Sequence, residues 1–137
     1  QQLSLASADL INDAFLRQRF LAEDAPCIHR APPSVRAKIE QRYQDSTTLD
    51  PVTQGFAHAF DFLFIDGGHD YVTIASDTRN ALAMAAPDAV VAWHDFQSKI
   101  HGDVTRFLGE YGQANRVYHV ENTMVAFQLR GRFADGF

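Results

Sequence analysis

Short apolar runs that end in polar residues are the clearest pattern in the second half of the chain. Residues 62–65 form one such run, which stops at Asp66, and residues 89–93 form another, which stops at His94. Continuous apolar runs of this length are typical of parallel strands that are buried on both faces. We therefore predict two buried strands, each with polar residues at its carboxyl end.

Apolar residues at helical spacing lie before, between and after these two runs. One stretch extends from about residue 71 to residue 86, where Pro87 breaks it, and another follows Asp103, which we expect to cap it. Residues 7–23 show the same periodicity near the start of the chain. Three helices are therefore predicted, two of which follow the buried strands.

The segment between these regions carries weaker signals. Residues 24–34 have the composition of a loop. Residues 35–43 fit either a strand, in which Ile39, Gln41 and Tyr43 share one face, or the continuation of a helix. The pair Asp50-Pro51 predicts the start of a further helix.

Two more strands are predicted near the end of the chain, over residues 116–120 and 123–129. They are joined by Glu121 and Asn122, and a link of two residues cannot make a parallel crossover, so this pair must be antiparallel. The order of elements is then βαβαββ. It indicates an α/β fold with an open, mostly parallel sheet and an antiparallel hairpin at the C-terminus.

The polar residues at the ends of the two buried strands are expected to converge. In open α/β sheets, ligands bind at the carboxyl ends of the strands, where Asp66, His94 and Asp95 are predicted to lie. Two carboxylates and an imidazole can share a divalent metal, and oxygen-rich ligation favours Mg²⁺ or a similar hard ion. The structural alternative is that Asp66 ends its strand in a turn, Asp95 caps the next helix and His94 bonds to a loop.

Other candidates depend on single residues. His69 follows Asp66 on the same loop and can serve as a general base, because imidazole exchanges protons near neutrality; simple surface exposure is the alternative. Asp45 and Ser46 offer a carboxylate and a hydroxyl to a nucleoside or other polar ligand, although they also suit a turn or a helix cap. The other histidines show no partner pattern: His29, His58, His101 and His119.

Composition narrows the class of protein. A chain of 137 residues predicts a single domain over residues 1–137. Its net charge of −5 argues against a nucleic-acid or anionic-membrane partner. One cysteine, Cys27, allows no internal disulfide, and no apolar run approaches the ~20 residues that span a bilayer, so a cytoplasmic location is expected. Because residue 1 is Gln, we expect a processed chain or a piece of a longer one.

A family resemblance brings these signals together. Residues 60–71 read FDFLFIDGGHDY, Asp77 follows, and residues 90–96 read VVAWHDF. This pattern resembles the class I S-adenosylmethionine-dependent methyltransferases, in particular a bacterial group with IDGxHxY and HD-aromatic motifs. The similarity is specific over residues 60–129 and plausible over residues 35–59. It implies a Rossmann-like fold and methyl transfer from S-adenosylmethionine to an oxygen of a small molecule.

The resemblance also implies roles for the clustered residues. Asp66 would lie beside the methyl-sulfonium end of the cofactor, and in the metal-dependent O-methyltransferases this position binds a divalent cation. His94 and Asp95 would complete the metal site, which implies Mg²⁺ as a second cofactor. Family members more often carry acidic or amide residues at both of these last positions. His69 falls where that branch carries its base.

The cofactor site implied by the resemblance has a second part. Asp45 and Ser46 would follow the third strand of the family fold, near the adenine ring, while Asp66 and Gly67 would lie at the reactive end. The family also uses a glycine-rich loop after its first strand, yet none of the eight glycines falls within the first 54 residues. We therefore expect the chain to lack the first one or two strands of the family, or to descend from a relative that has lost the loop.

Three hypotheses for function follow. The leading one is a methyltransferase acting on a small-molecule acceptor, with Asp66 and His69 as its catalytic residues. The second is a non-catalytic α/β binding module, and the third is a metal-dependent hydrolase that uses the same acidic and histidine residues. Because an incomplete sheet would expose an edge strand, a homodimer is also expected.

Overall fold

The computed structural model describes residues 2–4, 32–38, 40–42 and 44–136. The chain divides into two compact units, Gln1–Thr48 and Leu49–Phe137. The predicted helix over residues 7–23 lies outside the described residues, as do Cys27 and His29. The single domain over residues 1–137 stays a prediction.

The first unit contains a short parallel pair of strands. Strand β1 (Gln2–Ser4) pairs with β2 (Glu40–Arg42). Of the two alternatives for residues 35–43, the strand is therefore the one observed over residues 40–42. Helix α4 (Pro33–Arg36) lies partly in the segment predicted as a loop, because a proline is well placed in the first turn of a helix. The short 3₁₀ helix η2 (Ser46–Thr48) completes this unit.

The second unit begins with a turn where a helix was predicted. The Asp50 carboxylate accepts from the backbone N–H of Val52 at 3.0 Å, as a helix cap would. The chain then turns only as far as Gly55, which has φ +71°. A residue in this left-handed conformation ends a helical turn, so the predicted helix start at Asp50-Pro51 is wrong, although its local capping signal is real.

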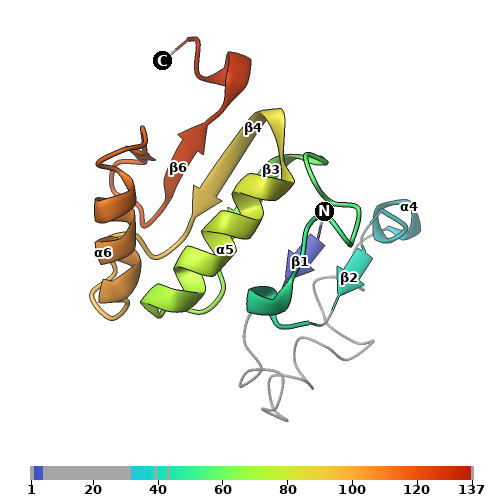
Figure 1. The fold of residues 1–137 in the computed structure, drawn as a ribbon, viewed down its shortest axis with the longest axis horizontal. Helices are drawn as coiled ribbons and strands as arrows, with labels where there is room; N and C mark the ends of the chain where they lie inside the picture. Colours follow the sequence, from blue (N-terminus) through green and yellow to red (C-terminus); the bar gives the residue numbers. More distant parts are fainter. Residues whose placement is uncertain (1, 5–31, 39, 43, 137) are drawn as a thin grey trace. The chain divides into compact units, whose positions relative to one another are not determined.

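A four-stranded sheet forms the centre of the second unit (Figure 1). Its strands, in spatial order, are β3 (Phe60–Ile65), β4 (Ala85–Trp93), β6 (Ala126–Leu129) and β5 (Tyr118–His119). Strands β3 and β4 are parallel, whereas the β4–β6 and β6–β5 pairs are antiparallel. The predicted α/β class and the antiparallel C-terminal pair are confirmed. The four-stranded sheet is mixed rather than mostly parallel, because only one of its three strand pairs, β3–β4, is parallel.

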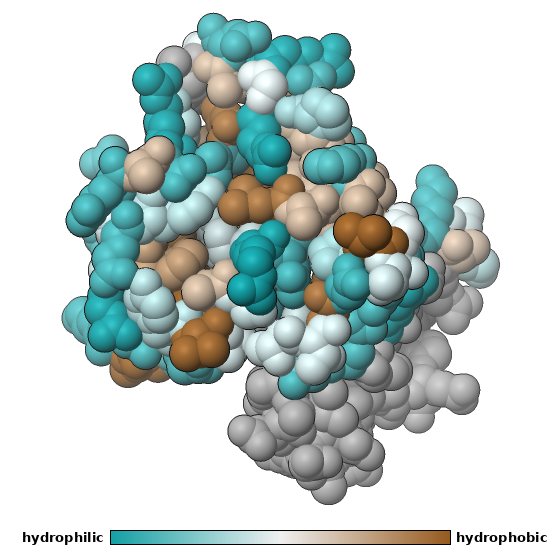
Figure 2. Space-filling view, viewed as in Figure 1, coloured by the Kyte–Doolittle hydropathy of each residue, from teal (hydrophilic) through white to brown (hydrophobic). Residues whose placement is uncertain are grey.

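Two helices cover one face of this sheet. Helix α5 (Tyr71–Met84) crosses β3 and β4 and packs beside α6 (Gly102–Tyr111) (Figure 1). The surface that these helices present is mainly hydrophilic, with apolar residues in scattered patches (Figure 2). The core between helices and sheet is made of buried apolar side chains, among them Leu63, Ile65, Ile74, Ala81, Val91, Trp93, Val104 and Leu108.

Two boundaries differ from the prediction. Helix α5 ends at Met84, and β4 already includes Pro87, which was expected to separate helix and strand. A residue before proline disfavours the helical conformation, so the chain becomes extended before Pro87 rather than at it. Helix α6 begins after His101, whereas Asp103 lies in its first turn instead of capping it.

The C-terminal hairpin has a longer connection than predicted. The expected strands over residues 116–120 and 123–129 shorten to β5 and β6. In the connection, the Val120 N–H donates to Val125 O at 3.0 Å, and the Thr123 N–H donates to Val120 O at 3.2 Å. Asn122 has φ 61°, so the chain reverses through a turn rather than a two-residue link.

In the described part of the chain, no helix combines the length and the apolar character needed to span a bilayer.

Candidate active site at the carboxyl ends of β3 and β4

The register of the two parallel strands brings Asp66 next to His94. Ile65 pairs with Trp93 at the ends of β3 and β4, and the His94 N–H donates to Ile65 O at 3.0 Å. The residues that follow each strand therefore leave the sheet at the same level. His94 Nδ1 lies 3.3 Å from Asp66 Oδ1.

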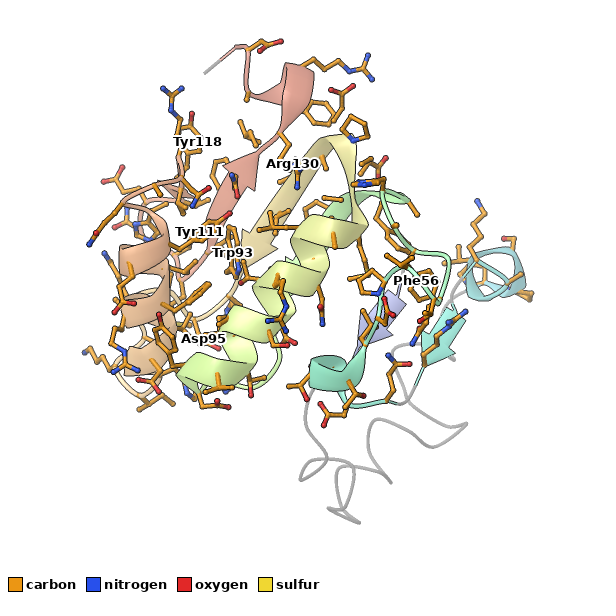
Figure 3. The ribbon with its side chains drawn as sticks, viewed as in Figure 1. Phe56, Trp93, Asp95, Tyr111, Tyr118 and Arg130 are labelled. Carbon is orange, nitrogen blue, oxygen red and sulfur yellow. The ribbon has the colours of Figure 1, made fainter. Side chains whose placement is uncertain are left out.

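Asp95 is the centre of this group. Its Oδ2 atom lies 2.8 Å from His69 Nε2 and 3.2 Å from His94 Nδ1. The side chain is only 10% exposed, and the residue has φ 62°. This left-handed conformation costs an ordinary residue about 1–2 kcal/mol, although aspartate tolerates it better than most. Figure 3 shows Asp95 beyond Trp93, between α6 and the beginning of α5.

His69 is positioned by the tight loop between β3 and α5. A Cβ atom on Gly68 would lie 2.7 Å from Thr73 Cγ2, so a larger residue there would displace the Thr73 side chain, which hydrogen-bonds to Asp70. Asp70 caps α5 by accepting from the N–H of Thr73 at 3.0 Å. The Thr73 hydroxyl, and then its N–H, lower the pKa of Asp70 by hydrogen bonding to the carboxylate. The cap fixes the loop and leaves His69 facing Asp95.

The end of β4 is anchored from inside the core (Figure 3). Trp93 is fully buried, and its indole Nε1–H donates to Thr78 Oγ1 at 2.8 Å. Its ring also packs against Tyr111, with centroids 5.9 Å apart. The Tyr111 hydroxyl donates to Gln128 Oε1 at 2.7 Å, and burial raises the pKa of this tyrosine. His94 and Asp95 thus follow a firmly held residue.

His101 is a member of this cluster that the sequence interpretation missed. It was set aside for lack of a partner pattern, but its ring stacks on that of His69 with centroids 3.7 Å apart. It is the residue directly before α6. The only signal in the sequence is that position, in the loop that follows the second strand end. By contrast, His58 and His119 bond to backbone carbonyls elsewhere.

Asp45 and Ser46 lie in the other unit of the chain. The Asp45 carboxylate accepts from the hydroxyl of Thr47 at 2.7 Å and from its N–H at 2.8 Å, and these bonds lower the pKa of Asp45. Ser46 is buried. The structural alternative of a turn or cap therefore describes what Asp45 does here. A shared cofactor site with Asp66 and Gly67 stays a prediction.

The clustered side chains form two groups with metal-binding chemistry. One group is Asp66, His94 and Asp95, as predicted, and the other is His69, Asp95 and His101. In each group, one ligand atom per residue lies within 4.8 Å of the others. The two carboxylates of the first group suit a hard ion such as Mg²⁺, whereas an imidazole suits a borderline transition ion. The first group thus fits Mg²⁺ through two of its three residues.

Comparison with known proteins gives one family and one fold. A family model described as a methyltransferase domain matches residues 7–96. No curated protein matches the chain.

Among solved structures, the chain is similar to the MycE methyltransferase from the mycinamycin biosynthetic pathway, in complex with Mg and SAH. The TM-score is 0.51 and the sequence identity is 16%. The match covers 78% of this chain and 36% of the MycE chain, so the present chain spans about a third of the length of that protein. At this identity the similarity shows a shared fold.

Proposed function

The chain belongs to the family of methyltransferase domains, and from this premise we propose that it transfers a methyl group from S-adenosylmethionine to an oxygen of a small molecule. The observation that carries the proposal is the cluster at the carboxyl ends of β3 and β4. There, His69 Nε2 lies 2.8 Å from the nearly buried carboxylate of Asp95, and the more exposed carboxylate of Asp66 lies 3.3 Å from His94 Nδ1. This arrangement offers a general base in His69, a carboxylate in Asp95 that orients the base, and a second carboxylate in Asp66 for the acceptor.

The proposed reaction uses His69 as the general base. When its Nε2–H donates to Asp95, its Nδ1 atom holds a lone pair that can accept the proton of a hydroxyl group. The acceptor oxygen, placed near Asp66, attacks the methyl carbon as the carbon–sulfur bond breaks. The products are a methyl ether and S-adenosylhomocysteine (SAH), and the proton remains on His69. Holding the acceptor and the methyl group in line supplies much of the rate.

A divalent cation fits this proposal through two residues. Asp66 and Asp95 would hold Mg²⁺, which supplies positive charge that eases deprotonation of a hydroxyl group. MycE was solved with Mg and SAH, which supports both cofactors as candidates here. His94 is the departure from an all-oxygen site.

The proposal also includes the cellular location and the oligomeric state of the protein. The single cysteine supports a cytoplasmic location. The homodimer expected from the sequence stays a prediction.

The test is a calorimetric titration of the chain with SAH, with and without Mg²⁺. We expect binding of SAH, and release of SAH from S-adenosylmethionine when a panel of small hydroxyl compounds is added. Asp66→Ala should lower that release by about 10²–10³-fold, a range typical for removing one group that stabilises a transition state. Asp88→Asn is the matched control, since Asp88 lies at the other end of the sheet.

The opposite outcomes are equally informative. A folded chain that binds no SAH contradicts the proposal for this chain on its own, and favours either a piece of a longer enzyme or the non-catalytic binding module. Binding of a metal without SAH, together with ester or phosphoester cleavage, favours the metal-dependent hydrolase. Unchanged transfer in Asp66→Ala contradicts the assignment of Asp66.

A further inference from the structure

We propose that His69, Asp95 and His101 form a second metal site, which takes a borderline divalent transition ion such as Zn²⁺ or Co²⁺. These residues come from the loop after β3, the end of β4 and the residue before α6. One ligand atom from each lies within 4.8 Å of the other two. The fold therefore brings two imidazoles and one carboxylate together from three separate segments.

The geometry is close to that of a bound ion. His69 Nε2 and Asp95 Oδ2 are 2.8 Å apart. Two ligands on a tetrahedral zinc ion, each at about 2.0–2.1 Å, lie roughly 3.3 Å from one another. These two atoms thus need to separate by only about half an ångström. The rings of His69 and His101 stack with an interplanar angle of 19°, so they must tilt toward the ion, which would open the stack.

The charge on Asp95 gives a reason for an ion to bind. Its carboxylate is 10% exposed, and its ionic partners in the described part of the chain are the imidazoles of His69 and His94. A buried carboxylate needs compensating charge or several hydrogen bonds. A divalent ion held with two neutral imidazoles supplies that charge without requiring either ring to be protonated.

The ligand set separates this site from the one that resembles a magnesium site. Two imidazole nitrogens and one carboxylate suit Zn²⁺, Co²⁺ and similar ions, whereas Mg²⁺ prefers an octahedral shell of oxygens. Three protein ligands also leave at least one position for water or another molecule. Because both groups use Asp95, an ion bound by His69 and His101 competes for that carboxylate with the Asp66 group.

One consequence rests on the proposed function. A transition ion bound to Nε2 of His69 would leave the ring's proton on Nδ1, so that His69 could not accept a proton from a hydroxyl group. Binding of the ion would therefore inhibit methyl transfer. The binding site itself does not depend on that function, since it follows from the three ligands alone.

The test is a Co²⁺ titration of the chain, followed by visible d–d absorption and by displacement with Zn²⁺. We expect the d–d absorbance to saturate with added Co²⁺ and to have the intensity typical of Co²⁺ with four or five ligands. Zn²⁺ should abolish this absorbance, and excess Mg²⁺ should not. His101→Phe keeps a ring against His69 but removes the ligand, and should weaken Co²⁺ binding at least about tenfold. His101→Asn, which suits the start of a helix, is a second variant in case the first fails to fold.

Two controls locate the ion. His119→Phe changes a histidine that bonds to Thr123 O outside both groups, and should leave the titration unchanged. His94→Ala removes a ligand of the Asp66 group, but His94 Nδ1 also contacts Oδ2 of the shared Asp95 at 3.2 Å, so this variant should lower Co²⁺ affinity less than the His101 variants do. If His94→Ala abolishes binding while the His101 variants retain it, the ion occupies the other group and the proposal is wrong.

Failure of this proposal can be told apart from failure of the proposed function. SAH titration of the parent chain and of the His101 variants measures cofactor binding without reference to Co²⁺. A chain that binds SAH but gives no Co²⁺ spectrum overturns only the second metal site.

Discussion

An aspartate lies near each end of β4, and the two aspartates, Asp88 and Asp95, contact different partners. Toward the beginning of the strand, Asp88 accepts from Arg132 Nε and from the Arg132 N–H, each at 2.9 Å. Beyond its end, Asp95 contacts His69 and His94. The Asp88 side chain is 36% exposed, against 10% for Asp95.

The chemistry open to each carboxylate depends on the partner that it contacts. A guanidinium group stays charged at all ordinary pH values, so the Asp88–Arg132 contact fixes the segment after β6 and offers no chemistry. An imidazole gains and loses protons near neutral pH and can bind a metal. Asp95 is thus more buried than Asp88, and its partners are imidazoles, which can bind a metal, rather than a guanidinium group.

The largest stability effect is expected at the structural end, from Gly131→Ala. Gly131 has φ +57°, and a Cβ atom there would lie 2.1 Å from Asp88 Oδ1 and 2.5 Å from Pro87 O. The left-handed conformation costs about 1–2 kcal/mol, and overpacking adds about 1–3 kcal/mol. We expect the free energy of unfolding to fall by about 2–5 kcal/mol in denaturant titrations. The fluorescence of the single tryptophan, Trp93, reports on this unit.

Gly55→Ala is the matched control for that substitution. Gly55 has φ +71°, but an added Cβ would meet no atom within 4 Å. Only the conformational cost of about 1–2 kcal/mol should appear. Equal losses in the two variants would show that the contact with Asp88 and Pro87 contributes nothing.

The next largest effect is expected from Co²⁺, which should stabilise the chain through Asp95 and not through Asp88. At a Co²⁺ concentration 100 times its dissociation constant, binding to the folded state alone adds about 2.7 kcal/mol to the free energy of unfolding. We expect that increase in the parent chain and in Asp88→Asn, but not in Asp95→Asn. Thermal unfolding with and without Co²⁺ measures it. A full increase in Asp95→Asn would remove Asp95 from both candidate metal groups.

Some of this site was predictable because its signals are local. The apolar runs of β3 and β4 are short and continuous, and parallel neighbours end at the same edge, so the meeting of Asp66 with His94 and Asp95 could be foreseen. His101 could not be, because its contact with His69 depends on where α6 packs. The same holds for Asp103, which the sequence marks as a cap but which instead accepts from the Tyr71 N–H of α5 at 3.2 Å.

The predicted boundaries were wrong where a local signal was real but another residue ended the helix or turn. Asp50 caps a turn as expected, but Gly55 stops it before a helix forms. Pro87 does break α5, but it acts on the residues before it, so β4 begins at Ala85. The residue types show that α5 must end near Pro87. The exact boundary between α5 and β4 also depends on the strand pairing between Phe60 and Ala85.

The smallest effect is expected at Asp70, a carboxylate with a structural role that lies next to His69 in the candidate site. It caps α5 through Thr73, only one residue from His69. Asp70→Ala should cost about 1 kcal/mol at pH 7, the usual value of such a cap. Denaturant unfolding followed by Trp93 fluorescence measures the cost.

The pH dependence of that cost follows from the direction of the pKa shift. Hydrogen bonds from Thr73 lower the pKa of Asp70 in the folded chain. Its contribution is therefore present above the unfolded pKa of about 3.9 and is lost as the pH falls through the lower folded value. The difference between the parent and Asp70→Ala should narrow below about pH 4, while Asp70→Asn, which keeps a capping oxygen, should show a flatter profile. If the difference in unfolding free energy between the parent and Asp70→Ala stays constant down to the acid transition, the charge on Asp70 adds nothing to its role as a cap. Any neutral acceptor could then replace the Asp70 carboxylate, in contrast to the carboxylate of Asp95.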